Sequence, residues 1–147
     1  MNLRSARSEV FETGHLDLAA GERETPVSGT DAHQEVLQVV VGRRPRNRQY
    51  LARLVTCELT YQPTTRGGRV IVSIPPHGEV GYISARSSAT LVEYVGAAMT
   101  DRGLEGGLTC AGKVMAEWHR RRNFRSPFYG ATVSLLLPVD LFSEGVT

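Results

Sequence analysis

The chain is 147 residues long, 41% of them hydrophobic, and its 17 basic and 15 acidic residues give a formal net charge of +2. This length suits one domain with a single hydrophobic core, and the composition excludes collagen-like, disordered and membrane-spanning classes. The first residues, from Met1 to Asp17, lack the apolar segment of a secretory signal. From these features we expect a cytoplasmic protein.

Residues 1–34 differ from the rest of the chain in charge and patterning. They carry three arginines against six acidic residues, a net charge of −3, whereas the remainder carries +5. The segment has no sustained apolar periodicity and contains three glycines and Pro26, so burial cannot offset the entropy of ordering it. We predict a flexible acidic N-terminal extension over 1–34, a domain over 35–138 and a C-terminal tail over 139–147.

Strands are predicted in the first half of the domain. A β-branched apolar run ends at Gly42, and apolar side chains then alternate with polar ones over two later stretches, as in strands with one buried face. Prolines and paired glycines between these stretches mark turns. The four strands predicted in this half are 36–41, 53–61, 70–74 and 78–84.

The period becomes helical over 84–103. The apolar residues that recur at helical spacing are Leu91, Val92, Val95, Ala98 and Met99. Alternating patterns then predict two closing strands, over 110–118 and 131–137. The resulting order, β-β-β-β-α-β-β, predicts a mainly β fold with one helix, a small barrel rather than a doubly wound sheet.

The candidate catalytic residues are sparse. Cys57 and Cys110 lie 53 positions apart, outside any Cys-x-x-Cys or Cys/His cluster, so we expect two buried free thiols. The four histidines are scattered, and the motifs of nucleotide-binding, hydrolase and zinc-protease sites are absent. The sequence therefore predicts a protein that is not an enzyme and uses no metal or cofactor.

Two arginine-rich segments interrupt the predicted strands. The first carries Arg43, Arg44, Arg46 and Arg48 ahead of Tyr50, and the second carries Arg120, Arg121, Arg122 and Arg125 with Phe124 and Phe128. Arginine pairs with phosphates and flat rings stack on unpaired bases, so this mixture is typical of a surface for single-stranded nucleic acid. Arg66 and Arg69, on either side of a Gly-Gly turn, extend the predicted nucleic-acid-binding set.

Each of these features has a structural alternative. Trp118 and Tyr129 can be core residues at strand ends, while the arginines only solvate their loops. Arg66 and Arg69 can serve to keep a sheet edge soluble. Because 16 of the 17 basic residues are arginine, codon usage is a further explanation for the arginine content.

The pattern of strands and helix resembles the HIRAN domain, as found in bacterial stand-alone HIRAN-like proteins. The motifs that carry the resemblance are 39–42, 70–74, Gly81-Tyr82-Ile83, a helix opening near Ala89, 110–118 and 129–133. The resemblance covers roughly residues 35–138 and implies an OB-like or SH3-like small barrel that binds DNA, with single-stranded 3′ ends as the ligand of the helicase-associated members. Those members carry an N-x-x-D-x-x-A segment, whereas residues 61–69 here contain neither asparagine nor aspartate, so 3′-end specificity is not carried over.

The function predicted from the sequence is that of a non-enzymatic nucleic-acid-binding module. The arginine-rich segments would bind the backbone phosphates of single-stranded or distorted DNA, and Tyr50, Phe124 or Phe128 would stack on its bases. The alternative is a protein–protein interaction subunit of a larger assembly, with a separate protein as its partner and no direct contact with DNA.

Overall fold

Antiparallel strands dominate the computed structural model, which describes residues 7–10, 16–18, 20–44, 48–101, 108–118 and 128–138. The strands are β1 (Arg7–Val10), β2 (Leu16–Leu18), β3 (Arg23–Pro26), β4 (Tyr50–Gln62), β5 (Arg69–Ile74), β6 (Gly78–Ser84), β7 (Leu108–Trp118) and β8 (Phe128–Leu137). The helices are the 3-10 helix η1 (Thr30–His33), α1 (Gln34–Val41) and α2 (Ala89–Asp101).

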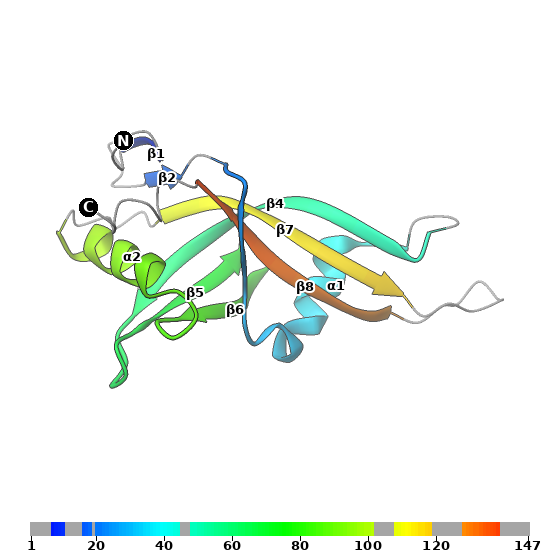
Figure 1. The fold of residues 1–147 in the computed structure, drawn as a ribbon. Coiled ribbons are helices and arrows are strands. Elements are labelled where there is room, and N and C mark those ends of the chain that lie inside the picture. Colours follow the sequence, from blue (N-terminus) through cyan, green and yellow to red (C-terminus); the bar gives the residue numbers. More distant parts are fainter. Residues whose placement is uncertain are drawn as a thin grey trace.

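Six strands form one curled sheet with the neighbour order β3-β8-β7-β4-β5-β6 (Figure 1). All of these neighbours are antiparallel, and β4 and β7 pair along most of their length. The short hairpin of β1 and β2 joins the start of β7, to which β2 runs parallel. The described part of the chain is therefore mainly β, in agreement with the predicted small barrel.

The segment after β3 links β8 to β6, the strand at the far edge of this sheet. The Val27 N–H donates to the Val133 carbonyl on β8 at 2.9 Å. Ser28 then exchanges two hydrogen bonds with Tyr82 on β6: its N–H donates to the Tyr82 carbonyl at 2.8 Å, and its carbonyl accepts from the Tyr82 N–H at 3.0 Å. The predicted Gly81-Tyr82-Ile83 strand is thus the place where the curled sheet meets itself.

Gly81 lies at this meeting point. A Cβ at this position would lie 2.4 Å from the Ser28 carbonyl oxygen and 2.5 Å from Val27 Cγ1. We expect Gly81→Ala to lower the free energy of unfolding by about 1–3 kcal/mol, because the Ser28 carbonyl cannot move aside without disturbing its pairing with Tyr82. Urea denaturation measures this change, with Gly130→Ala as the control, since its Cβ would meet only Gln34 Oε1 at 3.4 Å. Equal losses in the two variants would contradict the packing explanation.

Buried side chains confirm most of the predicted elements. The apolar residues predicted to face inward on β5, β7 and β8 are buried, as are the helical residues Leu91, Val92, Val95 and Ala98 of α2. The confirmed strands are those predicted over 53–61, 70–74, 78–84, 110–118 and 131–137. The predicted helix over 84–103 is confirmed with narrower bounds.

The strand predicted over 36–41 is wrong. These residues belong to α1, which buries Leu37 and Val41, one helical turn apart, and exposes Val39 between them. A strand would place all three side chains on one face. A short apolar run fits either a strand or a buried helix, and here packing of α1 against β6 and β8 selects the helix.

The predicted element order and the single helix are consequently also wrong. The described chain runs β1-β2-β3-η1-α1-β4-β5-β6-α2-β7-β8. Part of the region predicted as a flexible extension, residues 1–34, contributes β3, whose Thr25 is buried and which pairs with β8. A strand of four residues is too short to show a periodicity that a sequence window detects.

Cys57 and Cys110 are directly opposite each other on β4 and β7, and both are buried and not joined in a disulfide, as predicted. Burial raises the pKa of the Cys57 thiol to about 12, so this thiol stays protonated at neutral pH. Since the thiolate is the reactive form, Cys57 has the properties of a core residue rather than a nucleophile.

In the described part of the chain, no helix is both long and apolar enough to cross a membrane.

Candidate binding surface

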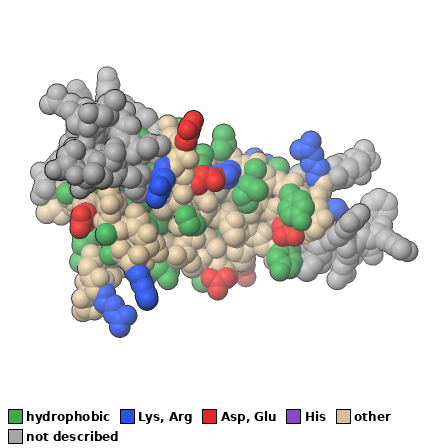
Figure 2. Space-filling model, in the orientation of Figure 1, with side chains coloured by type: hydrophobic (Ala, Val, Ile, Leu, Met, Phe, Trp, Pro, Cys, Tyr) green, Lys and Arg blue, Asp and Glu red, His purple; other side chains and the backbone are tan. Residues whose placement is uncertain are grey.

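The outer face of β4, β7 and β8 carries several exposed large hydrophobic side chains. Inward positions on these strands form the core, and the large hydrophobic residues on the outward side are Tyr50, Leu54, Met115 and Tyr129. Tyr50 is 58% exposed and Tyr129 is 65% exposed. Figure 2 shows hydrophobic side chains grouped around acidic ones near the right end of this face, next to arginine or lysine side chains.

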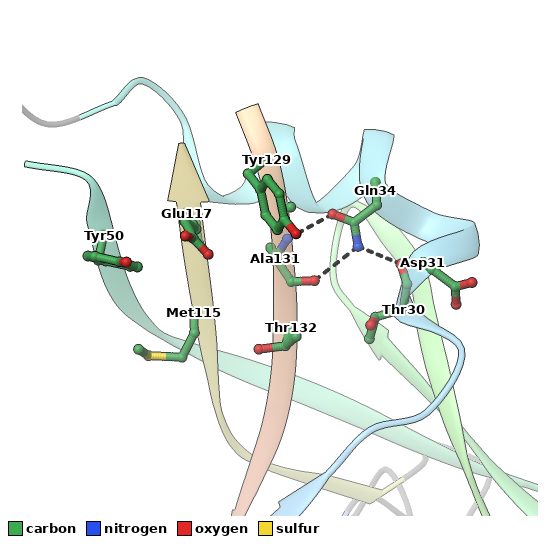
Figure 3. Close-up of a pocket in the computed structure, with 11 residues that line it drawn as sticks. Thr30, Asp31, Gln34, Tyr50, Met115, Glu117, Tyr129, Ala131 and Thr132 are labelled. Atoms are coloured by element: carbon green, nitrogen blue, oxygen red, sulfur yellow. Dashed lines mark hydrogen bonds between the residues drawn. The ribbon is translucent and has the colours of Figure 1, made fainter. Parts of the chain in front are cut away.

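A cavity of about 320 Å³ opens at this end of the sheet (Figure 3). Its lining comes from η1, the start of α1 and the facing ends of β4, β7 and β8, and comprises Thr30, Asp31, Gln34, Tyr50, Met115, Ala116, Glu117, Tyr129, Gly130, Ala131 and Thr132. In Figure 3 the Glu117 side chain lies between the rings of Tyr50 and Tyr129, and Met115 and Thr132 form a second row beside them. The site is thus a row of tyrosine, carboxylate and tyrosine across three strands.

Strand pairing explains how this row is built. Tyr50 is directly opposite Glu117, and Glu117 is directly opposite Gly130 on β8. At the next pair the register shifts by one residue: Trp118 is opposite Phe128 instead of Tyr129. Tyr129 is therefore the extra residue of a β-bulge in β8. A bulge redirects the side chain it carries, and here it turns the Tyr129 ring outward while Phe128 packs inward.

Gln34 fixes the wall of the cavity next to β8. Its Nε2 donates to the Ala131 carbonyl at 2.9 Å and to the Thr30 carbonyl at 2.8 Å, and its Oε1 accepts from the Ala131 N–H at 2.8 Å (Figure 3). Beyond the end of β3, the Gln34 side chain therefore makes the hydrogen bonds to the β8 backbone that a neighbouring strand would otherwise make. Both N–H groups of the amide are used in these bonds, so Gln34 has a structural role in holding α1 against β8.

The first arginine-rich segment leads into Tyr50, which lines this cavity. The Arg44 Nε donates to the Arg48 carbonyl at 2.9 Å, and the Trp118 N–H at the end of β7 donates to the Gln49 carbonyl at 3.0 Å. Arg43 and Arg48 are exposed, and Arg48 lies two positions before Tyr50. These arginines and the exposed tyrosines therefore share one end of the sheet.

The second arginine-rich segment lies between β7 and β8. Its flanking residues, Trp118 and Phe128, are opposite each other at the same end of the sheet as Tyr50. The predicted site residues Arg46, Arg120, Arg121, Arg122, Phe124 and Arg125 lie outside the described residues.

Arg66 and Arg69 are not part of this arrangement. They lie around the turn between β4 and β5, at the other end of β4, roughly 40 Å along the strand from Tyr50 at about 3.3 Å per residue. The Arg69 Nε donates to Gln62 Oε1 at 2.5 Å, and its guanidinium lies 5.2 Å from the centre of the Tyr82 ring. These contacts support the structural alternative for Arg69, which packs along its own sheet.

The aromatic residues divide between core and surface. Trp118 is buried, and Phe128, proposed from the sequence to stack on bases, packs partly buried against it with ring centres 5.7 Å apart at an angle of 73°. Tyr50 is exposed, as stacking would require. Tyr129 is exposed too, which excludes the alternative that it is a core residue.

Of the residues that line the cavity, the site residues predicted from the sequence include only Tyr50. The charged and large side chains among those missed are Asp31, Met115, Glu117 and Tyr129. Met115 and Glu117 could have been found, because alternation from the inward residues of β7 places both on the outer face. Tyr129 could not have been found in this way, since alternation along β8 predicts that its side chain points inward. The bulge alone turns this side chain outward. Asp31 reaches the site through η1, whose contact with β8 is tertiary.

The charged side chains that line the cavity are both acidic. Glu117 is half-buried and Asp31 is exposed. Among the described residues, no three histidine, cysteine, aspartate or glutamate side chains are grouped in a way that could hold a metal ion. The lining suits a ligand with an apolar or flat surface and hydrogen-bond donors.

Comparison of the chain with models of protein families, with curated proteins and with solved structures finds no match.

Proposed function

We propose that the chain is a non-enzymatic module that binds single-stranded or distorted DNA in the cytoplasm. One observation supports this proposal above the others: two exposed tyrosine rings, Tyr50 and Tyr129, lie at the end of the sheet from which the arginine-rich segment of Arg43 to Arg48 departs. A stacking surface beside a source of positive charge is the arrangement that non-sequence-specific binding of single strands uses.

The two kinds of residue would do different work. Arginines bind phosphates and release condensed counterions, which makes the affinity depend on salt. Tyrosine rings stack on unpaired bases and add a contribution that salt does not screen. Duplex DNA hides its base faces in the stack, so exposed rings favour single-stranded or distorted DNA over a regular duplex.

The protein-interaction alternative is favoured by the acidic groups. Asp31 and Glu117 repel phosphates, and together with the apolar side chains of Met115 and Leu54 they could receive a basic protein segment. This alternative predicts binding of a cationic peptide and no affinity for oligonucleotides at low salt.

Fluorescence anisotropy with a labelled oligo(dT) at two salt concentrations separates the two functions. We expect binding that weakens with salt, and a salt slope that falls by roughly 0.7 for each phosphate-binding arginine removed in an Arg43→Ala/Arg48→Ala variant. The matched control is Arg66→Ala/Arg86→Ala, which removes the same charge from exposed positions at the other end of β4. Absence of binding at low salt would overturn the DNA function, and equal slopes in the two variants would remove Arg43 and Arg48 from the site.

A further inference from the structure

The cavity beside the exposed tyrosines has a chemical preference that goes beyond stacking. Glu117 lies between the rings of Tyr50 and Tyr129 (Figure 3), and a carboxylate only accepts hydrogen bonds. The side-chain amide of Gln34 already makes hydrogen bonds to the backbone of Ala131 and Thr30. The Glu117 carboxylate is therefore the polar group at the centre of the row that can recognise a ligand.

The size of the cavity limits the ligand. Its volume of about 320 Å³ lies at the lower end of the roughly 300–1,000 Å³ that is typical of ligand pockets. A single flat ring system with a donor edge is the right order of size, and Met115 and Tyr50 supply the apolar contacts for its faces and edges.

We propose that this cavity is a nucleobase site that selects guanine, an inference that rests on the DNA-binding function proposed above. Guanine has two neighbouring donors on its Watson–Crick edge, the N1–H and the N2 amine, which match the two oxygens of one carboxylate. Thymine has one donor, N3–H, between two carbonyl oxygens that repel a carboxylate. Adenine and cytosine have one amine next to a ring nitrogen that accepts, so one of the two oxygens would face an acceptor.

The position of the arginines makes this orientation compatible with a negatively charged backbone. With the donor edge of the base at Glu117, the sugar and phosphates extend away from the carboxylate. Arg48 precedes the cavity residue Tyr50 by two positions, and Arg43 and Arg48 are exposed. The base edge and the phosphates would therefore be bound by groups of opposite charge in one continuous surface.

Anisotropy titrations with three labelled oligonucleotides test this proposal: oligo(dT), the same strand with one central guanine, and the same strand with one central inosine, which lacks the N2 amine. We expect the guanine strand to bind at least about fivefold more tightly than oligo(dT), the lower limit for one bidentate contact to a base. The inosine strand should lose most of this gain. Glu117→Gln should abolish the guanine preference without weakening the binding of oligo(dT), because it removes a carboxylate that repels phosphates and the thymine carbonyls. The melting temperature should stay unchanged.

The outcomes distinguish the two proposals. Salt-dependent binding of oligo(dT) with equal affinity for the guanine strand would overturn the guanine site and leave the DNA-binding function standing. A guanine preference that persists in Glu117→Gln would overturn the role of the carboxylate. No binding of any strand, with Glu117-dependent binding of a labelled oligo-arginine peptide instead, would overturn both in favour of a cationic protein segment.

Discussion

Removing both exposed rings, in a Tyr50→Ala/Tyr129→Ala variant, is expected to weaken the binding of single-stranded oligo(dT) by about 2–6 kcal/mol. Each base stacked on an aromatic side chain contributes about 1–3 kcal/mol by alanine substitution, and two rings flank Glu117. Tyr50→Ala and Tyr129→Ala alone should each lose about half of this binding free energy. Anisotropy titration at fixed salt measures the change, and the salt slope should stay as in the original protein because no charge is removed.

Leu54→Ala is the matched control for the two tyrosines. Leu54 is the most exposed large hydrophobic residue of β4 and does not line the cavity, so its removal should leave oligo(dT) affinity unchanged. Tyr50→Phe/Tyr129→Phe should retain most of the affinity, since stacking requires the ring and not the hydroxyl. Equal losses in Leu54→Ala and in the tyrosine variants would indicate a general apolar contact and contradict stacking.

Leu37→Ala is expected to lower the free energy of unfolding by about 2–5 kcal/mol. Leu37 is fully buried on α1 between the helix and the sheet, and truncating a buried leucine removes apolar burial and leaves a cavity. Urea denaturation monitored by circular dichroism measures this loss. Part of the cavity wall depends on α1 through Gln34, so oligonucleotide binding should weaken in this variant in proportion to the unfolded fraction.

Val39→Ala provides the control within the same helix. Val39 is 66% exposed, so its replacement should change the free energy of unfolding by no more than about 0.5 kcal/mol. Residues 37 and 39 would share one face of a strand but lie on different sides of a helix. Similar large losses in both variants would therefore contradict the helical assignment of 34–41.

Some alternatives for the site residues are now decided by burial and position. Trp118 is a core residue, and Arg69 is engaged with Gln62 and Tyr82 far from the cavity. Tyr129 is a surface residue. The prediction that arginines at 120–122 and 125 bind phosphates remains a prediction, since these residues lie outside the described part of the chain.

The sequence by itself determined the long strands, their inward faces and the helix α2. In these elements local periodicity and burial agree: Val70, Val72 and Ile74 alternate into the core, and the apolar residues of α2 recur at helical spacing. The burial of the two cysteines, which form no disulfide, followed from their position in such strands. These properties are local, so a window of sequence contains the information that decides them.

Only the tertiary structure decided α1, the place where the sheet closes and the composition of the cavity. Residues 36–41 are apolar enough for a strand or a helix, and packing against β6 and β8 selects the helix. The Ser28–Tyr82 pair and the bulge at Tyr129 depend on which strands become neighbours. The row of Tyr50, Glu117 and Tyr129 therefore arises from pairing between residues far apart in the sequence, which no local pattern encodes.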